Sequence, residues 1–188
     1  FEAGSYEVQT TRFATTPFPN LLNGRVKELP VIAQILANLL PQIGIAYASL
    51  GPALIEFPES YAVIPDAIAA SENIFFGGVM ADRKNGISMQ AVKACADVIQ
   101  QSATIEANGF ANLRFAALAN VRAGAPFFPA AYHDADVPAF AIAVESADVA
   151  VDAFAGQSDF GEGRSVLIAE IQRHGQAIAR IAKSELSS

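Results

Sequence analysis

Short apolar segments alternate with helical segments along this 188-residue chain, and this alternation restricts the possible folds more than any other feature. Runs that fit strands occupy residues 6–14, 43–50, 73–79, 112–118 and 138–144. Helical spacing of apolar residues occupies 22–40, 62–71, 88–108, 145–154 and 165–186. This order is typical of a parallel sheet covered by helices, and it fits both a doubly wound sheet and a closed β/α barrel. We therefore expect an α/β fold with parallel strands.

Two of the expected helices allow more specific predictions. In the helix 88–108, Ser88 is a suitable N-cap and Gly109 a suitable terminator. Cys95 lies on the apolar face of that helix, so we expect a buried, inert thiol. In the last helix, His174 has polar neighbours, so we expect its side chain to be exposed.

Composition excludes several classes of protein. Apolar residues make up 52% of the chain and charged residues only 16%, whereas soluble domains carry roughly 25% charged residues. The chain is therefore short of surface-forming residues, which suits a part that packs against more protein. A net charge of −7 argues against binding to a nucleic-acid backbone. With Cys95 as its single cysteine, the chain has no internal disulfide, and most thiolate zinc sites are excluded.

A long uncharged stretch raises the question of a membrane span. No charged residue occurs from Pro30 to Ile55, which is longer than the roughly 20 residues that a spanning helix needs. Pro41 and Pro52 interrupt this stretch, so a helix followed by a buried strand explains it better. We expect no membrane insertion and a cytoplasmic location. Because the first residue is Phe1 rather than Met, we also expect a fragment of a longer chain.

The first candidate site is the loop 77–87, which follows a buried strand and precedes a long helix. In parallel α/β folds, sites form on such loops at the carboxyl ends of strands. Arg83 and Lys84 would meet an anion beside the helix N-terminus. The alternative is an ordinary surface turn with solvated charges.

The second candidate site is the long loop 120–138, which contains Pro126, Phe127 and Tyr132. Loops of this length usually bind something or form a lid. Within it, His133 is followed by Asp134 and Asp136, which suits a general base whose tautomer is fixed by a carboxylate. Two alternatives stay open: metal ligation completed by Glu145 or Asp148, and a purely structural histidine. We assign no metal and no cofactor.

Two motifs at the candidate loops point to a known family. The first is Gly86, Ile87, Ser88, Met89, Ala91 and Val92; the second is Ala119, Asn120, Pro126, Phe127, Ala130, Ala131, Tyr132 and His133. In order and spacing these motifs resemble the domain-of-unknown-function 711 family. The resemblance implies a fold similar to the β/α barrel of pyruvate formate-lyase-like enzymes, in proteins much longer than this chain. Residues 1–188 would then be the N-terminal part of one barrel domain. The family has no established activity, and Cys95 in a helix does not support radical chemistry. Asp134 stands where members commonly have glycine.

Two functional hypotheses follow. In the first, an enzyme acts on a small, possibly anionic metabolite: Asn120 orients it, His133 transfers a proton and Asp134 positions His133. Its ligand-binding residues would be Arg83, Lys84, Gly86, Met89, Pro126, Phe127 and Tyr132. In the second, a non-catalytic ligand-binding or scaffold subunit closes its barrel against another segment or a second copy, as a homo-oligomer. Neither hypothesis includes nucleic acid or a membrane as a partner, and the reaction stays unidentified.

Overall fold

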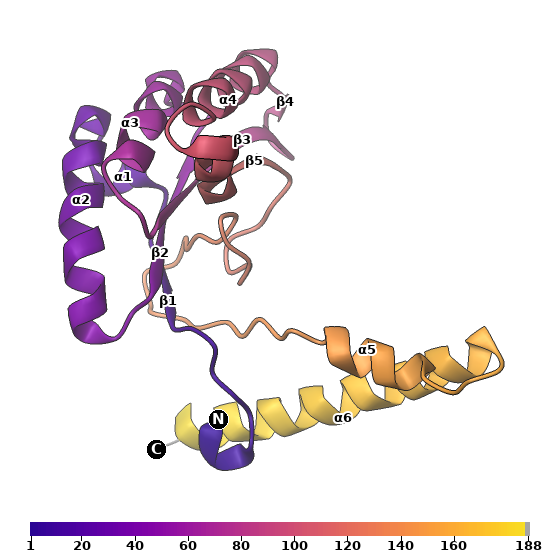
Figure 1. Cartoon of the computed structure of the whole chain (residues 1–188). Helices are drawn as coiled ribbons and strands as arrows, with labels where there is room; N and C mark the ends of the chain where they lie inside the picture. The colour runs from indigo at the N-terminus through magenta and orange to yellow at the C-terminus, as the bar shows by residue number, and fades with distance from the viewer. Residues whose placement is uncertain (187–188) are drawn as a thin grey trace. The chain divides into compact units, whose positions relative to one another are not determined.

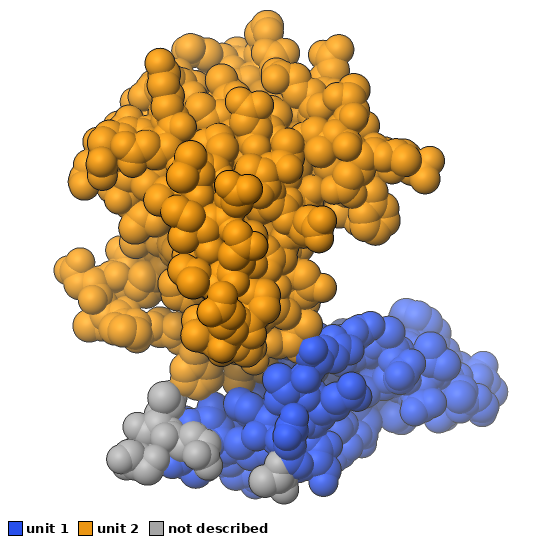
Figure 2. All heavy atoms as spheres, turned by 60° about the vertical axis from the view of Figure 1, so that its left-hand side comes forward, with its two compact units in different colours: residues 1–9, 143–188 blue, residues 10–142 orange. Residues whose placement is uncertain are grey.

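A computed structural model of the chain describes residues 1–186. These residues form two compact units (Figure 2): residues 10–142 make up the larger, and residues 1–9 together with those from 143 onward make up the smaller. Each unit is described by itself below. Among the residues that the structure describes, no helix has both the length and the apolar character needed to cross a membrane.

The larger unit contains the sheet and the helices that follow its strands (Figure 1). Its strands are β1 (Arg12–Ala14), β2 (Tyr47–Ala53), β3 (Ile74–Asp82), β4 (Gly86–Ile87) and β5 (Phe115–Ala119). Its helices are α1 (Phe18–Leu21), α2 (Leu29–Leu39), α3 (Ile64–Ala69) and α4 (Met89–Ser102), with 3₁₀ turns at Val26–Glu28, Leu40–Ile43, Pro58–Val63 and Ala107–Arg114.

The parallel strands follow one another in chain order. β1 pairs with β2, β2 with β3, and β3 with β5, all in parallel, whereas the two-residue β4 runs antiparallel to β3. This order lacks the reversal of a doubly wound sheet. The expected α/β class with mostly parallel strands is confirmed. In the part of the chain that is described the sheet is not closed, so the pyruvate formate-lyase-like barrel is not confirmed.

One hydrophobic core lies between the sheet and the layer formed by α2, α3 and α4. Ile74 and Phe76 of β3 are fully buried in this core. Cys95 of α4 is 1% exposed, and its Sγ lies 3.6 Å from the carbonyl oxygen of Gly78, so the expected buried thiol is confirmed. The expected N-cap is also confirmed, because the Ser88 hydroxyl accepts a hydrogen bond from the backbone N–H of Ala91.

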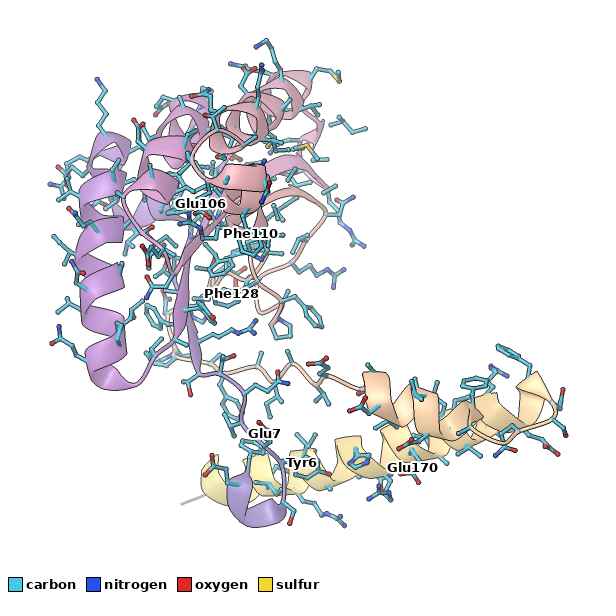
Figure 3. All side chains as sticks on the ribbon, in the orientation of Figure 1. Tyr6, Glu7, Glu106, Phe110, Phe128 and Glu170 are labelled. Carbon is cyan, nitrogen blue, oxygen red and sulfur yellow. The ribbon has the colours of Figure 1, made fainter. Side chains whose placement is uncertain are left out.

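The opposite face of the sheet carries an aromatic cluster, which we define as Tyr47, Phe75 and Phe128. The ring of Phe75 meets those of Tyr47 and Phe128 edge-on, with centroids 5.6 Å and 5.4 Å apart. The Arg12 guanidinium lies 5.4 Å from the Phe128 centroid and 5.8 Å from that of Tyr47. Since Phe128 belongs to the loop after β5 (Figure 3), this loop covers part of the face that lies away from the core.

Several expected elements differ from those observed. Of the expected strand 6–14 only Arg12–Ala14 pairs with a neighbour, and the expected strand 138–144 is wrong. Residues 138–144 are exposed and have no strand beside them, and a run of strand-forming residues becomes a strand only when its backbone finds a partner. The helix expected to reach residue 108 ends at Ser102, so Gly109 does not terminate it.

The smaller unit consists of residues 1–9 and two helices, α5 (Ala147–Phe154) and α6 (Phe160–Leu186), which pack against each other. The expected helices 145–154 and 165–186 are thus confirmed, the second with an earlier start. The expectation that His174 is exposed is wrong, because its side chain is 30% exposed and Nδ1 lies 3.0 Å from the Tyr6 hydroxyl.

Candidate functional site

A cavity of about 370 Å³ lies at the carboxyl ends of three parallel strands of the larger unit. It is lined by Asn20, Leu54, Glu56, Phe57, Val79, Ala81, Asp82, Leu118, Val121 and Tyr132. Leu54 follows β2, Val79 and Asp82 belong to β3, and Leu118 belongs to β5. Parallel α/β folds form their sites at this end of the sheet. The cavity therefore lies where the sequence placed the candidate loops.

Two carboxylates at this cavity are joined by one amide. The Asp82 Oδ1 atom accepts hydrogen bonds from the backbone N–H groups of Asn85 and Lys84, at 2.6 Å and 2.8 Å. The Asn85 Nδ2 atom donates to Asp82 Oδ2 at 2.9 Å and to Glu56 Oε1 at 3.3 Å. These hydrogen bonds, those from Asn85 above all, hold the pKa of Asp82 below its usual range. Asp82 therefore faces the cavity as an ionised acceptor.

Three hydrogen bonds fix the loop after β5 across the strand ends, and the Tyr132 side chain adds one within the loop. Backbone N–H groups of Asn120 and His133 donate to Ala81 and Thr15, both at 2.9 Å. The buried Ser49 hydroxyl donates to the Ala131 carbonyl at 2.7 Å, and the Tyr132 hydroxyl donates to the Val121 carbonyl at 2.9 Å. Burial raises the pKa of Tyr132, so this phenol remains protonated and able to donate at neutral pH.

Of the residues predicted to bind or react, the structure places Tyr132 in the wall of the cavity. Asn120 directly follows Ala119, the last residue of β5, and His133 directly follows Tyr132. Neither Asn120 nor His133 is part of the cavity wall. Asp134 is exposed beside His133. The roles given to these residues stay predictions.

The remaining predicted ligand-binding residues also lie outside the cavity wall: Arg83, Lys84, Gly86, Met89, Pro126 and Phe127. The Lys84 Nζ atom lies 3.8 Å from Glu56 Oε1, so its charge faces a carboxylate. Met89 and Phe127 are 72% and 64% exposed. Gly86 is the first residue of β4 and has a φ of +67°, which only glycine adopts readily.

Sequence reasoning missed Glu56 and Asp82, although a signal for both was present. Asp82 is the last residue of β3 and Glu56 follows β2 by three residues, so both carboxylates lie at the carboxyl ends of neighbouring parallel strands. Asp82 also directly precedes Arg83 and Lys84 in the candidate loop 77–87.

A metal centre finds no support in the described part of the chain. Within residues 1–186, no three His, Cys, Asp or Glu side chains are grouped so that they could hold a metal ion. Glu56 and Asp82 alone form a pair, bridged by an amide that donates rather than ligates.

Comparison with known proteins identifies the family. The family model described as uncharacterised ACR (DUF711) matches residues 1–187. A UPF0210 protein of Methanopyrus kandleri, a member of the same uncharacterised family, is 28% identical over 138 residues. That match covers 68% of this chain and 30% of the relative, so the chain spans less than a third of the relative it matches. The family expected from the two sequence motifs is therefore confirmed, and the chain belongs to the DUF711 family of uncharacterised proteins.

Proposed function

We propose that this part of the protein binds a small polar metabolite in the cavity at the carboxyl ends of β2, β3 and β5. The observation that carries the proposal is the presence of Glu56, Asp82 and Tyr132 in the wall of one cavity of about 370 Å³. Ligand pockets are typically about 300–1,000 Å³, mostly apolar, with a few polar groups that orient the ligand. Leu54, Val79 and Leu118 supply apolar wall here.

The charge of the wall favours a ligand that donates hydrogen bonds. Ionised Asp82 and its neighbour Glu56 accept hydrogen bonds and repel an anion. An amino or hydroxyl group of a ligand would donate to these carboxylates, as the Asn85 amide does. We therefore propose that the ligand is an amine or a polyol, and not the anionic metabolite that Arg83 and Lys84 led us to expect.

His133 is the residue we propose for proton transfer if the protein is an enzyme. Its backbone N–H donates to the Thr15 carbonyl, and its neighbour Tyr132 lines the cavity, which supports a position for His133 close to the cavity. Asn120 and Asp134 keep their proposed roles of orienting the ligand and positioning His133. The buried thiol of Cys95 suits a reducing compartment, and we propose the cytoplasm.

A binding screen with amines, amino sugars and polyols tests the proposal. We expect a ligand of this class to raise the melting temperature of the full-length protein. Glu56→Gln should weaken its affinity about tenfold, the usual effect of removing one charged hydrogen-bonding partner. Glu59→Gln is the matched control, because Glu59 is exposed nearby and does not line the cavity. Ligands that bind Glu56→Gln and the parent protein equally well would contradict the proposal.

His133→Ala tests whether His133 transfers a proton to or from a ligand that the protein converts. If His133 only contributes to the loop, the variant should bind the ligand as the parent does and convert it at the same rate. A loss of conversion with retained binding would support proton transfer. Loss of neither conversion nor binding would contradict a catalytic His133.

A second candidate function rests on the open sheet. β1 and β5 each pair on one side only within the described residues, and the relative is much longer than this chain. We propose that further strands of the full-length protein pair with β5 and close a barrel, as a scaffold or subunit interface. Hydrogen exchange of the backbone amides tests this proposal. The amides of β5 should exchange more slowly in the full-length protein than in a chain of residues 1–188 alone. Equal protection would contradict the proposal.

A further inference from the structure

The smaller unit contains a groove of about 410 Å³ that the proposed function does not use. It runs between the N-terminal segment and α6, and its wall is formed by Gly4, Ser5, Tyr6, Arg173, His174, Ala177, Arg180 and Ile181. Two arginines and a histidine line it, and no Asp or Glu does. In a chain with 19 acidic and 12 basic residues, this local excess of positive charge is unusual.

Hydrogen bonds in the groove fix the tautomer of His174. A guanidinium nitrogen of Arg173 lies 2.8 Å from His174 Nε2, and arginine only donates. Nε2 therefore accepts, which places the ring proton on Nδ1. That N–H donates to the Tyr6 hydroxyl at 3.0 Å. Because the Tyr6 oxygen accepts here, its own O–H hydrogen points elsewhere, and no acceptor for it occurs among the described residues.

Arg180 supplies a second set of donors without an acceptor. It lies two turns of α6 beyond Arg173, with the small side chain of Ala177 between them, and all three residues line the groove. Within residues 1–186 no carboxylate or carbonyl oxygen accepts from Arg180. The groove thus holds a guanidinium and a phenolic O–H that have no protein acceptor within residues 1–186.

The charge of Arg173 is partly compensated. Its guanidinium donates to Glu170 Oε2 at 2.6 Å and 3.0 Å. Glu170 belongs to α6, as Arg173 does, whereas Tyr6 belongs to the N-terminal segment (Figure 3). With Glu170 opposite Arg173, the positive charge of Arg180 remains for a ligand. A tetrahedral oxyanion suits these donors, because arginine binds phosphate oxygens through two parallel N–H groups and a hydroxyl can bind a third oxygen.

We propose that this groove binds a small phosphate-bearing ligand, with Arg180 and Tyr6 donating to the phosphate oxygens and Arg173 adding positive charge. The site lies wholly within the smaller unit and does not depend on the cavity at the strand ends. Room beside Ala177 and Ser5 is available for the part of the ligand that carries the phosphate.

Titration of the full chain with inorganic phosphate, followed by NMR at constant ionic strength in chloride, tests the proposal. We expect saturable shifts confined to residues 4–6 and 173–181. Arg180→Ala should weaken phosphate binding about tenfold, and Tyr6→Phe, which removes one hydroxyl donor, about threefold. Glu170→Gln should strengthen binding, because it leaves Arg173 uncompensated.

Arg164→Ala is the matched control, since Arg164 is an exposed arginine of α6 that does not line the groove. It should bind phosphate as the parent does. An equal loss in Arg164→Ala and Arg180→Ala would show general attraction of anions to the helix and would overturn the proposal. Shifts that do not saturate would overturn it as well. Circular dichroism establishes that each variant keeps its helices.

Discussion

Replacing Gly78 by alanine tests how closely β3 approaches α4. A Cβ atom at this position would lie 2.8 Å from Cys95 Sγ, 3.1 Å from Tyr61 Cε1 and 3.2 Å from Phe115 Cζ. All three neighbours are buried, so none can leave into solvent. One added methyl group in such a core costs about 1–3 kcal/mol. For a chain of this size that lowers the melting temperature by about 2–4 °C for each kcal/mol.

A second substitution tests whether this steric contact is the cause. Cys95→Ala removes the nearest atom and by itself costs about 1 kcal/mol through the small cavity it leaves. In Gly78→Ala/Cys95→Ala the added methyl occupies that cavity, so the loss should be smaller than the sum of the single losses. The tight contacts with Tyr61 and Phe115 remain, so the rescue should be partial.

Urea unfolding followed by far-UV circular dichroism measures these changes, because the chain contains no tryptophan to serve as a fluorescent probe. Gly175→Ala is the control: nothing lies within 4 Å of its added Cβ, and alanine favours a helix over glycine, so α6 should be stabilised. A Gly78→Ala variant as stable as the parent, or strictly additive losses in the double variant, would refute the packing argument.

Two further predictions concern the candidate site. Ser49→Ala should destabilise the protein by about 1–3 kcal/mol, because it leaves the Ala131 carbonyl without its buried donor. Amide exchange should then quicken in the loop 120–134, and unchanged exchange there would contradict the anchoring role. The depressed pKa of Asp82 means that its contribution to stability is present above the unfolded value of about 3.9 and is lost as pH falls through the folded pKa. NMR titration should show the Lys84 and Asn85 amides shifting with that carboxylate, and a midpoint above 3.9 would contradict this.

Much of the larger unit was predictable from local pattern. Alternating apolar runs and helical spacing predicted the strands and their parallel pairing, and Ser88 marked the start of α4. These features depend on neighbours within one turn or one strand. The position of Cys95 on the apolar face of its helix was enough to predict its burial.

The features that were not predictable depend on distant partners. Residues 138–144 have strand-forming side chains, yet the pattern does not say whether a neighbouring backbone exists to pair with. The half-buried position of His174 involves a hydrogen bond with Tyr6, a residue 168 positions away. Glu56 and Asp82 are likewise brought together, with the Asn85 amide donating to both, by the register between β2 and β3. The sequence pattern does not give that register.

The chain-order arrangement of β1, β2, β3 and β5 has a consequence for how the protein forms during synthesis. Each parallel strand pairs with the one made just before it, so no strand of the sheet has to wait for a distant segment. The sheet can grow by one strand and one helix at a time as the chain leaves the ribosome. We therefore expect the N-terminal pair β1–β2, with α1 against β2, to gain protection from proteolysis before β5 has been synthesised.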